Sequence, residues 1–217
     1  MGVRRHNFAL GEYYHVYNRG VEKRDIFVDP HDLKRFFQSM LEFNSLDPIG
    51  SLYEHSFFKE KPEVLKPLVH FIAYCLNPNH YHFILTPVVD KGIEKFMQRF
   101  GTGYTKYFNS RYRRSGTLFQ DKFKSAHIGS NEYLLHVSAY VNLNNRVHQL
   151  GSKASKLVKS SWTEYISSGS VGIMCKTDIV LDQFRSLGEY KEFALSSLDN
   201  IIERKQQEKE FAQALID

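Results

Sequence analysis

The sequence predicts an α+β fold in which helices pack against an antiparallel β-sheet. Two kinds of segment alternate along the chain: short runs rich in aromatic and β-branched residues, typical of strands, and longer runs with apolar residues every three or four positions, typical of amphipathic helices. With 217 residues and 42% hydrophobic content, the chain is long enough to bury a sizeable core.

The first elements are a strand and a helix. Residues 13–19, YYHVYNR, have the composition of a short strand. A helix is expected within residues 27–44, where Asp29 suits the N-cap and Pro30 suits the first helical turn. Residues 46–68 mix prolines with both signs of charge and show no period, so they are predicted to form a loop or insertion.

A β-hairpin is predicted next. Two apolar runs of strand length, residues 69–76 (VHFIAYCL) and 80–87 (HYHFILTP), are separated by the turn Asn77-Pro78-Asn79. Asparagine and proline are common in tight turns, so the two runs are expected to pair as neighbouring strands.

Three further elements complete the predicted sheet and its helices. A helix is expected over residues 90–112, with a kink at Gly101–Gly103, then a short strand over 123–129. A last helix is expected over residues 130–147, with Ser130 as its N-cap. The order β-α-β-β-α-β-α is typical of a ferredoxin-like (RRM-like) arrangement, in which the helices lie on one face of the antiparallel sheet.

The composition changes after about residue 150. Residues 151–161, GSKASKLVKSS, are small and polar, as in a linker, and a weak helix within 178–197 leads into a charged helical tail. We therefore predict a catalytic domain over residues 1–150 and a C-terminal helical extension over residues 151–217.

Charge and cysteine content narrow the class of protein. Lysine and arginine number 29 against 24 acidic residues, a formal charge of +5, which favours a polyanionic partner. Cys75 and Cys175 are the only cysteines, too few for a disulfide framework or a four-cysteine zinc site, and they favour a cytoplasmic protein. There is no apolar run of membrane-spanning length and no signal peptide is expected.

The pair His80 and His82 is the first candidate for chemistry. Residues two apart on a strand point to the same face, so these imidazoles project together and could share one divalent ion. The alternative, that both are half-buried sheet residues, stays open. The remaining histidines considered lack metal-ligand spacing and fit ordinary roles: His15, His70, His127 and His136.

Tyr140 and Asn144 are the second candidate. They are four residues apart on a predicted helix and therefore lie one turn apart on the same face. The Asn144 carbonyl could be a third metal ligand, and the Tyr140 phenol could attack a phosphate that the metal polarises. The chain has 13 tyrosines, of which Tyr140 is the best placed, whereas Tyr104 and Tyr107 fit packing or base stacking.

Residues 103–125 interleave basic and aromatic side chains. Basic residues can follow a phosphate backbone, and exposed aromatic rings can stack on unpaired bases. A helix with a solvated charged face and an aromatic core face would account for at least half of this segment. Counting Arg19 from the first strand, the residues expected to bind DNA are Arg19, Lys106, Arg111, Arg113, Arg114, Lys122 and Lys124.

These segments resemble the single-tyrosine HUH transposases, and among them the REP-associated tyrosine transposases of bacteria. The resemblance covers most of residues 13–165. It rests on the segments YHVYNRGVEKRDIF, YCLNPNHYHFIL, YTKYFNSRYRRSGTLFQDKFKS, YLLHVSAYVNLNN and SSWTEYISS. The chain departs from the family pattern where Asn77 replaces a common Met, Asn142 a His and Asn145 a Pro.

The resemblance implies a catalytic arrangement. His80, His82 and Asn144 would bind the divalent metal, Mg²⁺ or Mn²⁺, and Tyr140 would be the nucleophile. Mn²⁺ suits a mixed nitrogen and oxygen ligand set better than Mg²⁺ does. The family binds single-stranded DNA, often beside a hairpin, and cleaves it through a 5′-phosphotyrosine with release of a 3′-OH. Relatives act as a monomer or as a homodimer, and no membrane association is expected.

The prediction is therefore a transposase-like, metal-dependent single-stranded DNA endonuclease and strand transferase. One alternative is a non-catalytic single-stranded nucleic-acid-binding module of ferredoxin-like fold, which needs neither the metal nor Tyr140. Another is a metal-dependent phosphoesterase that uses water and forms no covalent intermediate. Zinc-protease and Walker-type phosphate-loop motifs are absent from the sequence.

Overall fold

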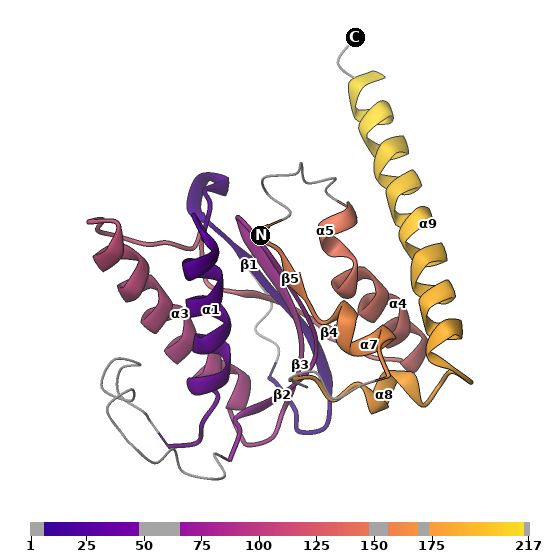
Figure 1. The fold of residues 1–217 in the computed structure, drawn as a ribbon, viewed down its shortest axis with the longest axis horizontal. Coiled ribbons are helices and arrows are strands. Elements are labelled where there is room, and N and C mark those ends of the chain that lie inside the picture. The colour runs from indigo at the N-terminus through magenta and orange to yellow at the C-terminus, as the bar shows by residue number, and fades with distance from the viewer. Residues whose placement is uncertain (1–6, 48–65, 148–155, 169–173, 215–217) are drawn as a thin grey trace.

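The computed structural model describes residues 7–47, 66–147, 156–168 and 174–214. A five-stranded sheet in the order β4-β1-β3-β2-β5 separates two layers of helices, and all its neighbouring strands are antiparallel (Figure 1). The α+β class predicted from the sequence is confirmed. So is the predicted alternation of strands and helices up to the helix that carries Tyr140.

The elements closely follow the expected segments in the first two thirds of the chain. The strands are β1 (Tyr13–Arg19), β2 (Val69–Asn77), β3 (His80–Pro87), β4 (Lys124–Ile128) and β5 (Lys159–Ser160). The helices are η1 (Val21–Lys23), α1 (Pro30–Glu42), α3 (Gly92–Arg111), α4 (Asn131–Asn142), α5 (Asn144–Val147), α7 (Trp162–Ile166), α8 (Asp178–Leu181) and α9 (Leu187–Ala214). Most of the predicted loop over 46–68 lies outside the described residues.

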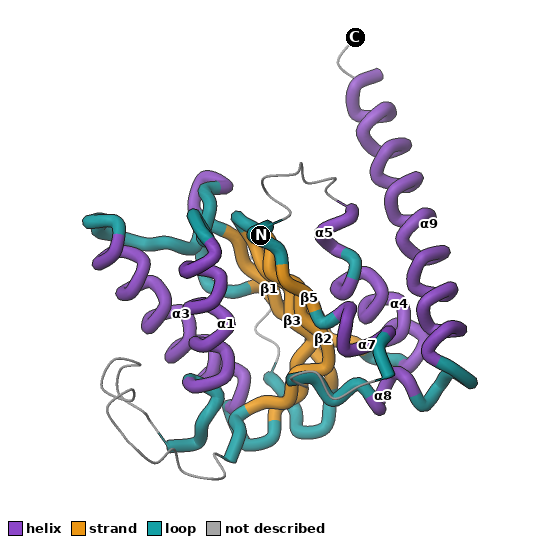
Figure 2. Tube along the Cα trace, viewed as in Figure 1, coloured by secondary structure: helices purple, strands orange, loops and turns teal. Residues whose placement is uncertain are grey.

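Helices α1 and α3 cover one face of the sheet (Figure 2). Helix α1 begins as predicted, with the Asp29 carboxylate accepting a hydrogen bond from the Asp32 amide and Pro30 in the first turn. Its apolar stripe packs on alternate strand residues such as Tyr81 and Phe83, which belong to the same core. This core holds most of the buried aromatic rings of the described residues.

The opposite face of the sheet is also covered, by α4, α7 and α9 (Figure 2). The expectation of helices on one face only was therefore wrong in this detail. The reason is visible in the strands themselves: Ile72, Cys75 and Ile84 point to the second face and are fully buried there. A strand buried on both faces has a continuous apolar sequence, and residues 69–76 form such a run.

Part of the C-terminal region joins the same sheet and the second core. Strand β5 pairs with the end of β2, and Tyr165 and Tyr190 pack in the core beneath α4. The boundary at residue 150 stays a prediction, since residues 148–155, which include the first part of the proposed linker, lie outside the described residues. The last part of that linker is described, and it contains β5. Within the part of the chain that the structure describes, no helix is both long and apolar enough to cross a bilayer.

Helix α3 is continuous through Gly101 and Gly103, the glycines at which a kink was expected. Gly103 has a packing role instead. A Cβ there would lie 2.4 Å from the Cζ of Phe43, the buried residue that caps the end of α1. A Cβ at Gly101 would meet no atom within 4 Å. Gly103 therefore lets α1 and α3 approach closely, which Gly101 does not.

We expect Gly103→Ala to lower the free energy of unfolding by roughly 1–3 kcal/mol, because the new methyl group overpacks the core against Phe43. The matched change Gly101→Ala should raise stability by up to about 1 kcal/mol, since alanine favours a helix and the space is open. Urea titration of both variants measures the difference. Equal stabilities would contradict a packing role for Gly103.

Candidate functional site

The register of the sheet sets the site at one end of three strands. Tyr17 pairs with His82 on one side and with Lys124 on the other, and Arg19 pairs with His80. Directly paired residues of antiparallel strands point to the same face, so these five side chains gather on one face. That face is the one that α4 covers, because Ile84, two residues after His82, belongs to the core under α4.

Helix α4 brings the predicted nucleophile to the two histidines. The ring centroids of Tyr140 and His82 lie 5.5 Å apart, with the rings nearly perpendicular. The Oδ1 atom of Asn144 lies 3.0 Å from the Nε2 atom of His80. The single helix expected over 130–147 is in fact two, because α4 ends at Asn142 and α5 begins at Asn144. The four predicted residues nevertheless converge.

Asn77 connects the hairpin to Asn144 and was missed by the sequence analysis. Its buried amide nitrogen lies 2.9 Å from the Oδ1 of Asn144 and 3.0 Å from the Nε2 of His80. The three side chains therefore form a triangle of polar contacts between β2, β3 and the start of α5. In the sequence analysis Asn77 was noted only because the resembled family commonly has Met at this position.

Asn79 fixes the orientation of the His80 ring. The Nδ1 of His80 lies 2.6 Å from the Oδ1 of Asn79, and the Asn79 amide donates to the carbonyl of Lys23. Because that amide oxygen can only accept, Nδ1 carries the proton and the Nε2 of a neutral ring presents a lone pair. This is the tautomer that a metal-binding histidine needs.

His15 plays the same part for His82. Its Nε2 lies 2.8 Å from the Nδ1 of His82, and the two rings stack with centroids 5.1 Å apart. Burial lowers the pKa of His15 to about 4, so this ring is neutral at physiological pH. The sequence analysis grouped His15 with the ordinary histidines, whereas the structure places it against His82. Its position two residues before Tyr17 on β1, hence on the same face, was the available signal.

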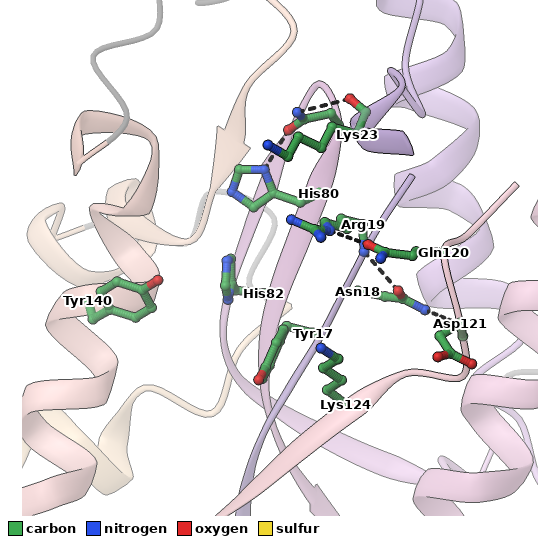
Figure 3. A pocket seen from close by; sticks show the side chains of 11 residues that line it. Tyr17, Asn18, Arg19, Lys23, His80, His82, Gln120, Asp121, Lys124 and Tyr140 are labelled. Atoms are coloured by element: carbon green, nitrogen blue, oxygen red, sulfur yellow. Dashed lines mark hydrogen bonds between the residues drawn. The ribbon is translucent and has the colours of Figure 1, made fainter. Parts of the chain in front are cut away.

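A cavity of about 650 Å³ opens beside these side chains (Figure 3). His80, His82 and Tyr140 line one part of it, and the basic residues Arg19 and Lys124 line another. The complete lining consists of Tyr17, Asn18, Arg19, Lys23, Asn79, His80, His82, Gln120, Asp121, Lys124 and Tyr140. The cavity thus joins a phenol, two imidazoles and cationic groups in one space.

Other basic residues of the interleaved segment lie away from this cavity. The Arg111 guanidinium lies 2.6 Å from Asp29 and 3.4 Å from the buried Asp32, and Arg114 lies over the Phe108 ring. Tyr104 is fully buried. Of the two roles predicted for it, packing and base stacking, the structure fits packing. Apart from Arg111, the exposed basic residues of this group that do not line the cavity are Lys106, Arg113 and Lys122.

One further cluster of possible metal ligands, among the described residues, is Asp29, His31 and Asp32. Its donor atoms already have partners. Arg111 contacts all three of these side chains, and the phenols of Tyr107 and Tyr112 donate to the two oxygens of Asp32. A guanidinium supplies the positive charge that a metal would bring, so this cluster is better explained as the anchored start of α1.

The residues at the histidine site fit a divalent cation better. Two acceptor atoms, His80 Nε2 and Asn144 Oδ1, face each other, and a second imidazole lies next to the first, with ring centroids 5.2 Å apart. The Nδ2 atom of Asn144 is buried without a hydrogen-bond partner. The Oδ1 of Asn144 accepts from Asn77 and keeps a second lone pair that a cation can use.

Tyr140 is a weak acid in this setting. Burial raises its pKa above the ordinary value, and the nearby Asn144 side chain offsets part of the effect. The phenol is therefore protonated at neutral pH, so attack on phosphorus requires loss of its proton and stabilisation of the phenolate.

Comparison with known proteins relates the chain to transposases. Residues 56–144 match the family model described as "Transposase IS200 like", a segment that contains both histidines, Tyr140 and Asn144. No curated protein matches the chain. A solved structure described as a REP-associated tyrosine transposase bound to a REP hairpin superposes with a TM-score of 0.55 and 13% identity, over 82% of this chain and 93% of that one. The chain is therefore similar to IS200-like transposases over residues 56–144, and its fold is similar to that of the REP-associated transposase.

Proposed function

We propose that the protein is a metal-dependent single-stranded DNA endonuclease and strand transferase that uses Tyr140 as its nucleophile. The observation that carries this proposal is the convergence of Tyr140 with His80, His82 and Asn144 at the edge of a cavity that also holds cationic side chains. The match of residues 56–144 to a transposase family model supports the same class of DNA chemistry.

The reaction follows from the phenol. The Oη of Tyr140 attacks a backbone phosphorus, a Tyr–O–P bond forms, and the bond from phosphorus to the 3′ oxygen breaks. The phenolic proton is lost and the leaving oxygen gains one, which yields a 5′-phosphotyrosine and a free 3′-OH. Because the new phosphodiester keeps the energy of the old bond, a 3′-OH can attack it in reverse and rejoin a strand.

The chain's own residues prepare this step. Asn79 and His15 orient the rings of His80 and His82, and Asn77 holds the Asn144 carboxamide against His80. We assign His80, His82 and Asn144 as the ligands of a Mg²⁺ or Mn²⁺ ion. When bound, this ion would polarise the phosphate and stabilise the developing negative charge.

The cavity suggests how the strand lies. Arg19 and Lys124 line it and can bind backbone phosphates next to the reacting one. Lys106, Arg113 and Lys122 are exposed outside it and could contact flanking DNA, such as a hairpin like the one bound by the similar solved structure. Arg111 and Arg114, engaged within the fold, would contribute less.

Each site needs residues of one chain only. Tyr140 packs against His82 of its own chain, so the arrangement requires no exchange of a helix between subunits. This favours a monomer as the active unit.

We expect Tyr140→Phe to abolish the covalent protein–DNA adduct, by at least about a thousandfold in rate, because the attacking oxygen is removed. Binding of the same DNA should be unchanged, since the ring remains. The assay is denaturing gel electrophoresis after incubation with labelled single-stranded hairpins and Mn²⁺. Tyr133→Phe is the matched control, a tyrosine of the same helix with an exposed side chain.

Wild-type adduct yield in Tyr140→Phe would refute the assignment of the nucleophile. DNA cleavage without any adduct, in both proteins, would instead favour a water-using phosphoesterase. DNA binding with neither product would favour the non-catalytic binding module.

We expect His80→Ala to weaken Mn²⁺ binding by about a hundredfold. Removing a residue that only supports a metal ligand typically costs roughly 10- to 100-fold in affinity, and loss of a ligand itself should cost at least the upper end of that range. His31→Ala should leave Mn²⁺ binding unchanged, because the partners of His31 include Arg111 rather than open space. Isothermal titration calorimetry of the DNA-free proteins measures both. The reverse pattern would place the metal at the start of α1.

A further inference from the structure

The turn after β1 has an unusual backbone. Glu22 and Lys23 have φ angles of 55° and 61°, in the left-handed region that residues other than glycine rarely adopt. Two consecutive residues in this region need strong support from their surroundings. The turn is also tight, since a Cβ on Gly20 would lie 2.1 Å from the carbonyl oxygen of Arg24.

Three hydrogen bonds to two other segments hold this turn. Gly20 donates to the carbonyl of Asn79 at 2.8 Å, and Val21 donates to the carbonyl of Leu118 at 2.9 Å. The side-chain amide of Asn79 in turn donates to the carbonyl of Lys23 at 3.2 Å. The hairpin between β2 and β3 therefore fixes the conformation of Lys23 through Asn79, the residue that also orients His80.

This hydrogen-bonded turn determines where the Lys23 side chain lies. It lines the cavity, near His80 and on the side of the two histidines opposite to Tyr140 (Figure 3). Glu22, its neighbour in the turn, points to Arg24 in an exposed ion pair. Among the described residues, the Lys23 ammonium forms no ion pair, whereas the Arg19 guanidinium donates to Gln120.

The charge of the cavity favours an anion. Its lining contains three cations, Arg19, Lys23 and Lys124, and one carboxylate, Asp121. An ammonium that lies in a polar cavity, without a carboxylate partner, can accept a phosphate without first breaking an ion pair.

We propose that Lys23 binds a backbone phosphate of the DNA strand, next to the phosphate that Tyr140 attacks and on the far side of the histidines. The left-handed turn and Asn79 hold the ammonium in place. The ligand is a phosphodiester of single-stranded DNA, and the inference rests on the proposed function, because it assumes that the strand passes through this cavity.

Lys23→Gly is the direct test, because glycine adopts the left-handed conformation readily and should keep or improve the fold. We expect about fivefold weaker binding of single-stranded DNA, the upper range for an exposed ion pair. The slope of log K against log salt should fall by about 0.7, the loss of one phosphate contact on a single strand. Fluorescence anisotropy in EDTA gives both values without metal or covalent reaction.

Lys91→Gly is the matched control. Lys91 is an exposed lysine with a φ angle of 55°, at the start of α3 and outside the cavity lining, so the change removes the same charge and the same backbone strain. It should leave affinity and salt slope close to wild type. Lys23→Arg should retain most of the binding, since the charge is kept.

Methylphosphonate substitution, one position at a time, identifies the contacted phosphate. One neutral linkage should weaken binding of the wild type but not of Lys23→Gly. Wild-type affinity and salt slope in Lys23→Gly, or losses equal to those of Lys91→Gly, would overturn the inference. If the wild type binds DNA but never forms an adduct, the proposed function fails while the binding result for Lys23 still stands.

Discussion

The polar triangle of Asn77, His80 and Asn144 is the interaction on which the site depends. It joins the two strands of the central hairpin to the segment that follows α4, through buried and partly buried contacts of 2.9–3.0 Å. Buried polar groups are costly unless paired, so this triangle specifies one seating of that segment on the sheet. The apolar core beneath α4 supplies the stability, and the triangle supplies the register that brings Tyr140 to His82.

A second polar network supports α4 on the side of α9 and β2. Asn142, at the position where a His is common in similar transposases, accepts a hydrogen bond from Ser161 and donates one to the Tyr190 phenol of α9. Ser161 also accepts from the backbone of Tyr74 on β2. Residues beyond 150 thus help to hold α4. Ser161 and Tyr190 satisfy both the oxygen and the nitrogen of the Asn142 side chain.

Much of the fold and the centre of the site could be predicted from the sequence, because they depend on local periodicity. Spacing of two along a strand placed His80 and His82 together, and spacing of four placed Tyr140 near Asn144. Their common location came from the family resemblance. The contributions of His15 and Asn79 depend on strand register and on a turn conformation, which composition does not encode. Likewise, charge alone could not show that Arg111 is taken up by Asp29 and Asp32.

The central claim is that the imidazoles and the carboxamide surround one cation beside the phenol. Anomalous diffraction from crystals grown with Mn²⁺ tests it directly. The account predicts a peak within coordination distance, about 2.0–2.3 Å, of His80, His82 and Asn144. A peak at Asp29, His31 and Asp32, with the histidine pair empty at saturating Mn²⁺, would contradict it.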